Sequence, residues 1–375
     1  MKKLILFFLG CTILISCNNN TKNVPIIDLN KIKHAIDLDL SVILNDISFV
    51  QISSDFLFSV DDQIYVTSQF LIIYRNKYSK ETASLDLFNR NGVHIRKLAT
   101  RGNGPGEFSL IEDFFVDDDE NILYYKDMRN RTRLFRIDLN NGITLDPLQI
   151  DFTYLTANYH QGKIYSFPDF KGWFTQTNES ADSSIVVYSI ALPSGEMTKY
   201  RGEHRYQFLV LGASISFYQD EIALINFGYS DTLFTFKDDK LIPRCVIDIS
   251  NKMTDFEKGG DLARIISVYN NGIVLSKNNV TYQSYGERGG ALNINTDYYV
   301  LYDRKGNVYK IDNTRVMNTT ISLKDPEKNY LTSSLLPIIC GKYGYMLVEH
   351  DVLETLPTGF DPNNDNPIII VGEVK

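Results

Sequence analysis

Arg101-Gly102-Asn103-Gly104-Pro105-Gly106-Glu107-Phe108 is the stretch of sequence that decides the fold. Three glycines at alternate positions around a proline do not fit a helix or a central strand, because glycine adopts positive φ and proline lacks a backbone donor. The stretch therefore predicts a tight crossing between two pieces of β-sheet, with Glu107 capping backbone N–H groups or pairing with Arg101. A phosphate-binding loop is disfavoured, because Glu107 would repel the anion and the following residues indicate a strand, whereas a dinucleotide loop opens a helix.

Hairpin patterns lie on both sides of this crossing. Residues 84–98 contain two strand-like runs joined by Asn91-Gly92, a dipeptide that favours a two-residue hairpin turn. Residues 111–125 contain two more runs, joined by an acidic turn at 117–119. The chain has 375 residues, of which 12% are aromatic. Aromatic enrichment with scattered glycine turns favours an all-β chain.

Turn signals of this kind recur along the whole chain. One set follows strand-like runs at Asn91-Gly92, Asn141-Gly142, Ser194-Gly195, Asp238-Asp239 and Lys305-Gly306. A second set marks inner hairpins at Asp61-Asp62, 117–119, Gln161-Gly162, Asn270-Asn271-Gly272 and Lys342-Tyr343-Gly344. Spacings in the first set are roughly 45 to 65 residues, the range of one propeller blade with its insertions. A four-stranded blade cannot bury both faces alone, so the blades must stack and the array must close.

Five such units fit between Phe56 and Tyr309, and a sixth is divided between the two ends of the chain. Its inner strands are expected near 335–340 and 345–350, and its other strands at 367–371 and 47–52. Joining both ends in one blade removes the open sheet edges that promote aggregation. The sequence therefore predicts an all-β, six-bladed β-propeller closed by N- and C-terminal strands that share the last blade.

Three stretches lack the pattern of strands. Residues 251–266 are polar with a weak helical spacing, residues 281–295 form a glycine-rich insertion, and residues 351–366 form a long connection. Loops on a rigid scaffold commonly carry function, so we expect binding residues at such places.

The first residues have the pattern of a signal peptide. Lys2-Lys3 precedes the apolar run 4–15, which is too short to span a bilayer as a mature helix. The run ends in Leu14-Ile15-Ser16-Cys17, which resembles the lipobox of bacterial lipoproteins. This resemblance implies cleavage before Cys17, a diacylglyceryl group on its thiol and an acylated amino terminus, carrying chains such as palmitate. Several acyl chains give a stable membrane anchor. An ordinary secretory peptide or an uncleaved anchor fits the following polar residues less well.

The chain accordingly divides into a lipoprotein signal peptide at 1–16, a lipidated Cys17 with a polar tether at 17–23, and a propeller at 24–375. Lipoproteins sent to the cell surface in some Gram-negative groups carry acidic residues after the cysteine, and the tether has none. We therefore expect a cell-envelope protein on the outer membrane, facing the periplasm.

Three motifs resemble those of a large family of bacterial six-bladed β-propeller lipoproteins. They are residues 102–108, Asp231-Thr232-Leu233-Phe234 and Asp365-Asn366-Pro367-Ile368. The resemblance covers almost the whole mature chain and implies the fold and the membrane address. The family supplies no general catalytic residues, so none is assigned here.

Motifs for catalysis, metals and cofactors are missing from the sequence. HExxH and GxSxG do not occur, and the five histidines are dispersed. Asp117, Asp119 and Asn121 alternate as in a calcium loop, but Ile122 stands where a glycine is needed and Met128 where a bidentate acid is needed. A solvated hairpin turn is the better interpretation, and we expect no metal or cofactor.

The cysteine content and the net charge narrow the possible disulfide pairing and the possible partners of the protein. Cys245 and Cys340 are left in the mature chain, and either a disulfide or two buried strand cysteines fit, the second better. The formal net charge is −8, and no Lys/Arg block is long enough to follow a phosphate backbone, so nucleic acid is not an expected partner.

Aromatic residues on predicted loops are the candidate ligand-binding residues. Trp173 lies in a Gly/Pro-containing loop, and Tyr285 and Arg288 lie in the glycine-rich insertion. Such rings can stack on a sugar or clasp a peptide, although covering the apolar edge of a blade is the preferred interpretation for Trp173. The sequence favours a monomeric, membrane-anchored binding or scaffold protein for a small molecule, a glycan, a peptide or a partner protein. The alternative is an envelope lyase or hydrolase that acts at the central channel.

Overall fold

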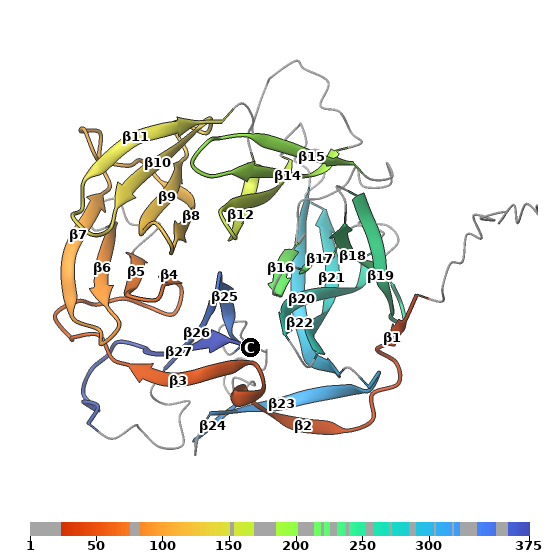
Figure 1. The fold of residues 1–375 in the computed structure, drawn as a ribbon. Coiled ribbons are helices and arrows are strands. Elements are labelled where there is room, and N and C mark those ends of the chain that lie inside the picture. Colours follow the sequence, from red (N-terminus) through yellow and green to blue (C-terminus); the bar gives the residue numbers. More distant parts are fainter. Residues whose placement is uncertain are drawn as a thin grey trace, which may run out of the picture.

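The structure is a computed structural model that describes residues 24–75, 83–150, 154–168, 185–201, 214–218, 221–225, 231–237, 240–252, 259–269, 272–284, 290–303, 305–316, 319–322, 336–349 and 359–375. Its strands form six four-stranded blades in a ring around a central axis (Figure 1). The predicted all-β, six-bladed propeller is confirmed. Within these residues, no helix is long and apolar enough to cross a membrane.

Five blades follow one another along the chain, each made of consecutive antiparallel strands. The first two are β4 (Gln63–Val66), β5 (Phe70–Arg75), β6 (Ser84–Asn89) and β7 (His94–Thr100), then β8 (Ile111–Asp117), β9 (Ile122–Asp127), β10 (Arg133–Asp138) and β11 (Thr144–Gln149). The next two are β12 (Tyr154–His160), β13 (Lys163–Pro168), β14 (Ile185–Ala191) and β15 (Met197–Arg201), then β16 (Ser214–Tyr218), β17 (Glu221–Ile225), β18 (Thr232–Lys237) and β19 (Lys240–Asp248). The fifth is β20 (Gly260–Tyr269), β21 (Gly272–Ser284), β22 (Gly290–Asp303) and β23 (Val308–Val316), with β24 (Thr319–Ser322) paired to β23.

The sixth blade joins the two ends of the chain, as predicted. Its strand order is β25 (Ile338–Cys340), β26 (Tyr343–Val348), β27 (Ile368–Val374) and β3 (Leu44–Val50). β27 pairs antiparallel with β26 on one side and with β3 on the other, where Ile370 lies opposite Phe49. The ring is therefore closed by main-chain hydrogen bonds between segments more than 300 residues apart.

The side chain of Asn366 reinforces this closure from a site that is 1% exposed. Its Nδ2 donates to the main-chain oxygens of Ser53, at 3.0 Å, and Phe56, at 2.9 Å. Its Oδ1 accepts a hydrogen bond from the Phe58 N–H at 3.0 Å. Because one buried amide satisfies backbone groups of the segment that follows β3, the last loop and the first blade are held together.

The N-terminal segment also pairs with the outside of two other blades. β1 (Ile26–Asp28) runs parallel to β19, and β2 (Ala35–Asp39) runs parallel to β23. The short 3-10 helix η1 (Leu40–Val42) then turns the chain into β3. These two strands were not predicted, because parallel pairing with a distant strand leaves no local sequence signal.

Burial within a blade depends on the position of the strand. The central strand β5 is buried along Leu71–Tyr74, because neighbouring blades cover both of its faces. The outer strand β7 is mostly exposed or half-buried. A strand covered on both faces reads as a continuous apolar run, which explains why the inner strands are the most hydrophobic ones.

The glycine-proline stretch forms the crossing between the first and second blades, as predicted. The Gly104 N–H donates to Glu107 Oε2 at 2.6 Å, which confirms the capping role. A Cβ atom on Gly102 would lie 1.9 Å from the same oxygen, so a side chain there would displace the Glu107 carboxylate. Gly106 has a φ of +77°, a left-handed conformation that other residues rarely adopt, whereas Gly104 does not lie in that region.

Several expectations for the remaining segments were wrong. Residues 260–266 belong to β20, and most of the predicted glycine-rich insertion continues β21 and β22 as a paired extension, with Thr281 opposite Asn293. Glycine content concealed this strand pairing. Asp61-Asp62 is not a hairpin tip but precedes β4, and the turn lies between Val66 and Phe70.

We predict that Gly106→Val lowers the free energy of unfolding by more than about 1 kcal/mol, because a β-branched residue is strained at positive φ. A Cβ at this position meets no atom within 4 Å, so the effect isolates backbone strain from packing. Asn103→Val, at an exposed neighbour, is the control and should change stability by about 0.5 kcal/mol or less. Equal denaturant midpoints for the two variants would contradict the role assigned to Gly106.

Candidate functional site

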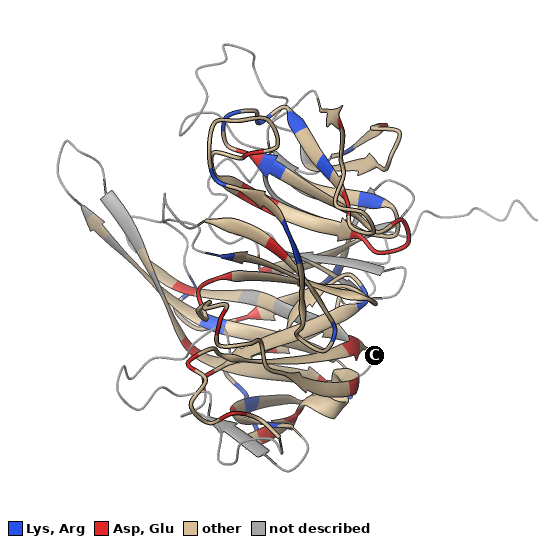
Figure 2. Cartoon of the chain, turned by 90° about the vertical axis from the view of Figure 1, so that its left-hand side faces the viewer, with Lys and Arg blue, Asp and Glu red and all other residues tan. Residues whose placement is uncertain are grey.

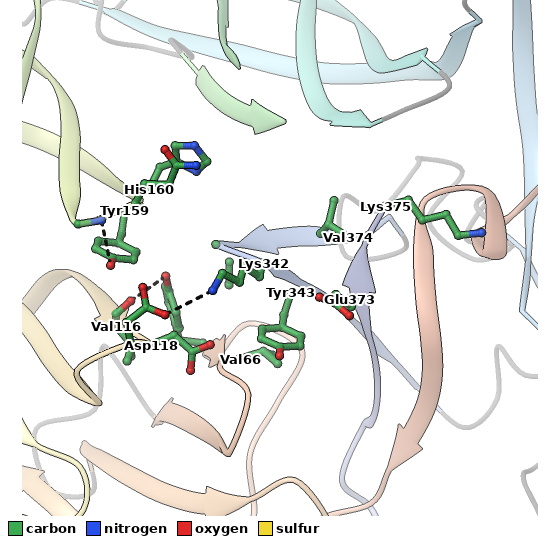
Figure 3. Close-up of a pocket in the computed structure, with 16 residues that line it drawn as sticks. Val66, Val116, Asp118, Tyr159, His160, Lys342, Tyr343, Glu373, Val374 and Lys375 are labelled. Atoms are coloured by element: carbon green, nitrogen blue, oxygen red, sulfur yellow. Dashed lines mark hydrogen bonds and ion pairs between the residues drawn. The ribbon is translucent and has the colours of Figure 1, made fainter. Parts of the chain in front are cut away.

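A pocket of about 650 Å³ lies at the centre of one face of the ring. Its walls come from the turns that join the first two strands of the second, third and sixth blades, from the end of β4 and from the residues at the end of β27. The lining residues are Tyr65, Val66, Val116, Asp118, Asp119, Tyr159, His160, Gln161, Gly162, Cys340, Gly341, Lys342, Tyr343, Glu373, Val374 and Lys375 (Figure 3). Because these turns meet at the propeller axis, side chains distant in sequence face one another.

Tyr159 fixes one wall of the pocket. Its hydroxyl donates to Oδ1 of Asp117, which is 5% exposed, at 2.9 Å, and accepts from the Gly162 N–H at 3.1 Å. Its ring is stacked on Phe115, with the ring centroids 6.1 Å apart. Burial, reinforced by the charge of Asp117, raises the pKa of Tyr159 well above its usual value. The hydroxyl therefore stays protonated and ties the third blade to the second.

Two carboxylates project from the turn between β8 and β9. Asp118 is held in place by Ser68 of the first blade, whose N–H donates at 3.0 Å and whose hydroxyl donates at 2.8 Å. Asp119 faces Lys342 of the sixth blade across the pocket, at 3.4 Å (Figure 3). Both members of that pair are more than half exposed, so it adds little stability and can open.

An aromatic ring and a cation form the opposite rim. The guanidinium of Arg90 lies over the ring of Tyr343, 5.0 Å from its centroid, and donates to the Thr67 carbonyl at 2.8 Å. Burial raises the pKa of Tyr343, and Asp118 and Glu373 act in the same direction. The Tyr343 hydroxyl is therefore a hydrogen-bond donor at neutral pH. One face of the Tyr343 ring is already covered by the Arg90 guanidinium.

Cys340 lies at the base of the pocket and remains a thiol. Cys340 and Cys245 are both free and buried, which confirms the preferred interpretation over a disulfide. Burial raises the pKa of each thiol to about 12. Neither sulfur therefore has the thiolate character that nucleophilic or metal-binding cysteines require.

The pocket combines hydrogen-bond acceptors, donors and one aromatic platform. Carboxylates of Asp118, Asp119 and Glu373 accept, whereas Lys342 and the Tyr343 hydroxyl donate. Among the described residues, no group of His, Cys, Asp and Glu is arranged to hold a metal ion. The chemistry of this set is recognition of a polar, uncharged group with both donors and acceptors.

The residues singled out from the sequence lie elsewhere. Gly102, Gly104, Pro105, Gly106 and Glu107 belong to the crossing between blades, which the strand order places on the face opposite the pocket. Cys17, Trp173, Tyr285 and Arg288 lie outside the described residues. The structure therefore leaves their predicted roles as predictions.

Most of the pocket was missed because its residues were interpreted one turn at a time. The turn at 117–119 was interpreted as a solvated hairpin turn in preference to a calcium loop, and Lys342-Tyr343 only as a hairpin tip. The sequence does contain a usable signal for the pocket, because the turns between the inner strands of every blade must converge on the propeller axis once the ring closes. Superposing the repeats would have placed Asp118, His160 and Lys342 together.

Comparisons with known proteins agree with this architecture. The sequence profile of a family described as "6-bladed beta-propeller", DUF5128, matches residues 16–328. A crystal structure of a "Putative exported protein" from Bacteroides fragilis NCTC 9343 is similar over 93% of this chain and 99% of that one, with 14% identity and a TM-score of 0.58. A member of the DUF4221 family from Bacteroides vulgatus covers 88% of this chain and 97% of its own, at 11% identity and a TM-score of 0.48. At these identities the likeness concerns the fold alone, and a comparison with curated proteins found no match.

Proposed function

The chain belongs to the DUF5128 family of six-bladed β-propellers, and from this premise we propose that it is a cell-envelope lipoprotein whose central pocket binds a hydroxyl-rich ligand, such as a segment of a glycan. The observation that carries the proposal is the composition of the pocket. Carboxylates, two lysines and tyrosine side chains line it from four blades.

The balance of charge supports a neutral, polar ligand. The pocket is lined by three side-chain carboxylates and by Lys342 and Lys375, and Asp118 already accepts two hydrogen bonds from Ser68. A phosphate or sulfate would meet these carboxylates at close range and be repelled. A sugar hydroxyl both donates and accepts, so it can bridge a carboxylate and a lysine without an uncompensated charge.

Tyr343 supports the same ligand class. Its ring is held by Arg90, and a ring fixed in this way can pack against the apolar face of a sugar. The turns that carry the lining residues are parts of a closed scaffold, so the site needs little ordering when a ligand binds. Preformed sites lose less free energy to ordering and bind more tightly for the same contacts.

An envelope enzyme at the same place is the second candidate. His160 lies in the pocket with Asp118 and Lys342, and such groups can exchange protons with a substrate. A hydrolase or lyase would convert the ligand, whereas a binding protein would return it intact. Chromatography of a bound glycan after incubation distinguishes the two.

The membrane address rests on the N-terminal sequence and on the fold. Cys17 follows a lipobox-like sequence, and the tether separates it from the first described strand, β1. A protein of the same fold is described as exported, which agrees with a place outside the cytoplasm.

We predict that a screen of envelope glycans by thermal unfolding finds a ligand that stabilises residues 24–375. At a concentration of 100 times Kd, binding to the native state raises the free energy of unfolding by about 2.7 kcal/mol. Tyr343→Ala and Lys342→Ala should weaken binding roughly tenfold each, equivalent to about 1.4 kcal/mol. Lys305→Ala, at an exposed tip of an outer hairpin, is the control and should bind as the parent does. A ligand whose affinity is the same in all three variants binds elsewhere, and the pocket proposal then fails.

For the anchor, we predict that Cys17→Ala abolishes labelling by a fatty-acid probe and releases the protein from the membrane fraction. Loss of the acyl chains removes the apolar area that holds the protein at the bilayer. Ser16→Ala keeps a small residue before the cysteine and should still be labelled. Persistent labelling of the Cys17→Ala protein would rule out this residue as the lipidation site.

A further inference from the structure

Among the described residues, the fifth blade carries an extension that the strands of the other blades do not have. β21 and β22 have 13 and 14 residues and pair along their whole length, from Gly272 opposite Asp303 to Ser284 opposite Gly290. β20 accompanies β21 only as far as Val280. Figure 2 shows paired strands that project beyond the disc, on the side away from the C-terminus. We call the outer part of this hairpin, on the far side of Tyr299 from the ring, the arm. It comprises residues 290–298 and those of residues 272–284 that pair with them.

One edge of the arm is open. β23 pairs with β22 only from Tyr299 to Tyr302 and then pairs with β24 instead. Gly290–Tyr298 of β22 therefore pair with β21 on one side and with no other described strand. Their outward N–H and C=O groups form a ladder that only another extended strand can complete.

Most of this edge lacks the features that natural proteins use to prevent pairing, and the exceptions are Asp297 and the register shift beside it. Gly290–Tyr298 contain no proline, lysine or arginine. The pairing with β21 has no register shift beyond the one between Lys277 and Asn278, at the base of the arm. Long, regular edge strands without such protection associate with other strands.

We infer that the open edge of β22 pairs with the same edge of a second copy, in the antiparallel sense about a two-fold axis. With the midpoint of the free stretch, Ile294, on the axis, Asn293 of each copy lies opposite Asn295 of the other. Both residues are exposed, and opposed asparagine amides can hydrogen-bond across strands.

The charge pattern fits this register. Asp297 is the one charged residue of the free stretch, and the register places it opposite Ala291 rather than opposite its own copy. Its carboxylate is already paired with Lys277, at 2.5 Å. No like charges therefore face each other, which is the condition for self-pairing of an edge.

The expected complex is weak in solution and stronger on a membrane. A ladder of nine residues buries less surface than a stable dimer requires, so dissociation in dilute solution is expected. Two copies held at one bilayer by the proposed lipid anchor have a higher effective concentration, an effect that depends on that proposed anchor. The pocket lies on the opposite face of the ring and stays accessible in the dimer. This differs from the monomer expected from the sequence.

The test uses full-length protein in membranes, with two differently tagged copies expressed together. Asn293→Cys in one copy and Asn295→Cys in the other should form a disulfide between the tags on mild oxidation. Thr281→Cys, exposed on β21 opposite Asn293, is the control partner for Asn295→Cys and should not cross-link, because it lies one strand away from the edge. Equal yields for the two mixtures, or no disulfide in either, would overturn the inference.

A charge exchange tests the same contact without cysteine chemistry. A copy with Asn293→Lys and Asn295→Lys should lose the self-association that the parent shows in sedimentation experiments at high protein concentration, because each lysine faces another lysine. A copy with Asn293→Asp and Asn295→Asp should also lose it, and mixing the two should restore a heterodimer. Self-association that is unchanged in both double variants would overturn the inference. So would cross-linking of the cysteine variants to a different envelope protein in place of the second copy.

Discussion

The pairing of β27 with β3 is the interaction on which the rest of the structure depends. Each blade is a sheet covered on both faces by its neighbours, so no blade is stable unless the ring is closed. The closing strands bring together Ile368, Ile369, Ile370 and Val371, which are all fully buried. Burial of such side chains contributes about 1.5–3 kcal/mol each. The polar hydrogen bonds of Asn366 then fix the loop that precedes β27 against the start of the first blade.

Closure also determines where function can lie. When the ring is complete, the turns between inner strands gather at the axis, and Asp118, His160 and Lys342 come to share one pocket. None of these residues forms a motif with its sequence neighbours. The same topology places the far ends of β21 and β22 on the opposite face, so the pocket and the arm are separate surfaces on one scaffold.

Features with local causes were predictable from the sequence, and most features with distant causes were not. Gly92, Gly142, Gly195 and Gly306 all have positive φ at hairpin tips, as their turn dipeptides predicted. The shared sixth blade was also predicted, because two short β-branched segments had no hairpin partner nearby. β1 and β2 were missed, since their parallel partners lie more than 200 residues away. The arm was missed because its glycines indicated a loop, and the pocket because it exists only in the closed ring.

The most direct test of closure is the thermal unfolding of a chain that ends at Asn366, compared with the full propeller. If β27 closes the ring, its removal exposes apolar faces of the sixth blade and of the neighbouring blades. The free energy of unfolding should fall by several kcal/mol, with a lower melting temperature and a broader transition. A truncated protein that stays soluble and melts at the temperature of the full chain would contradict the dependence of the fold on this pairing.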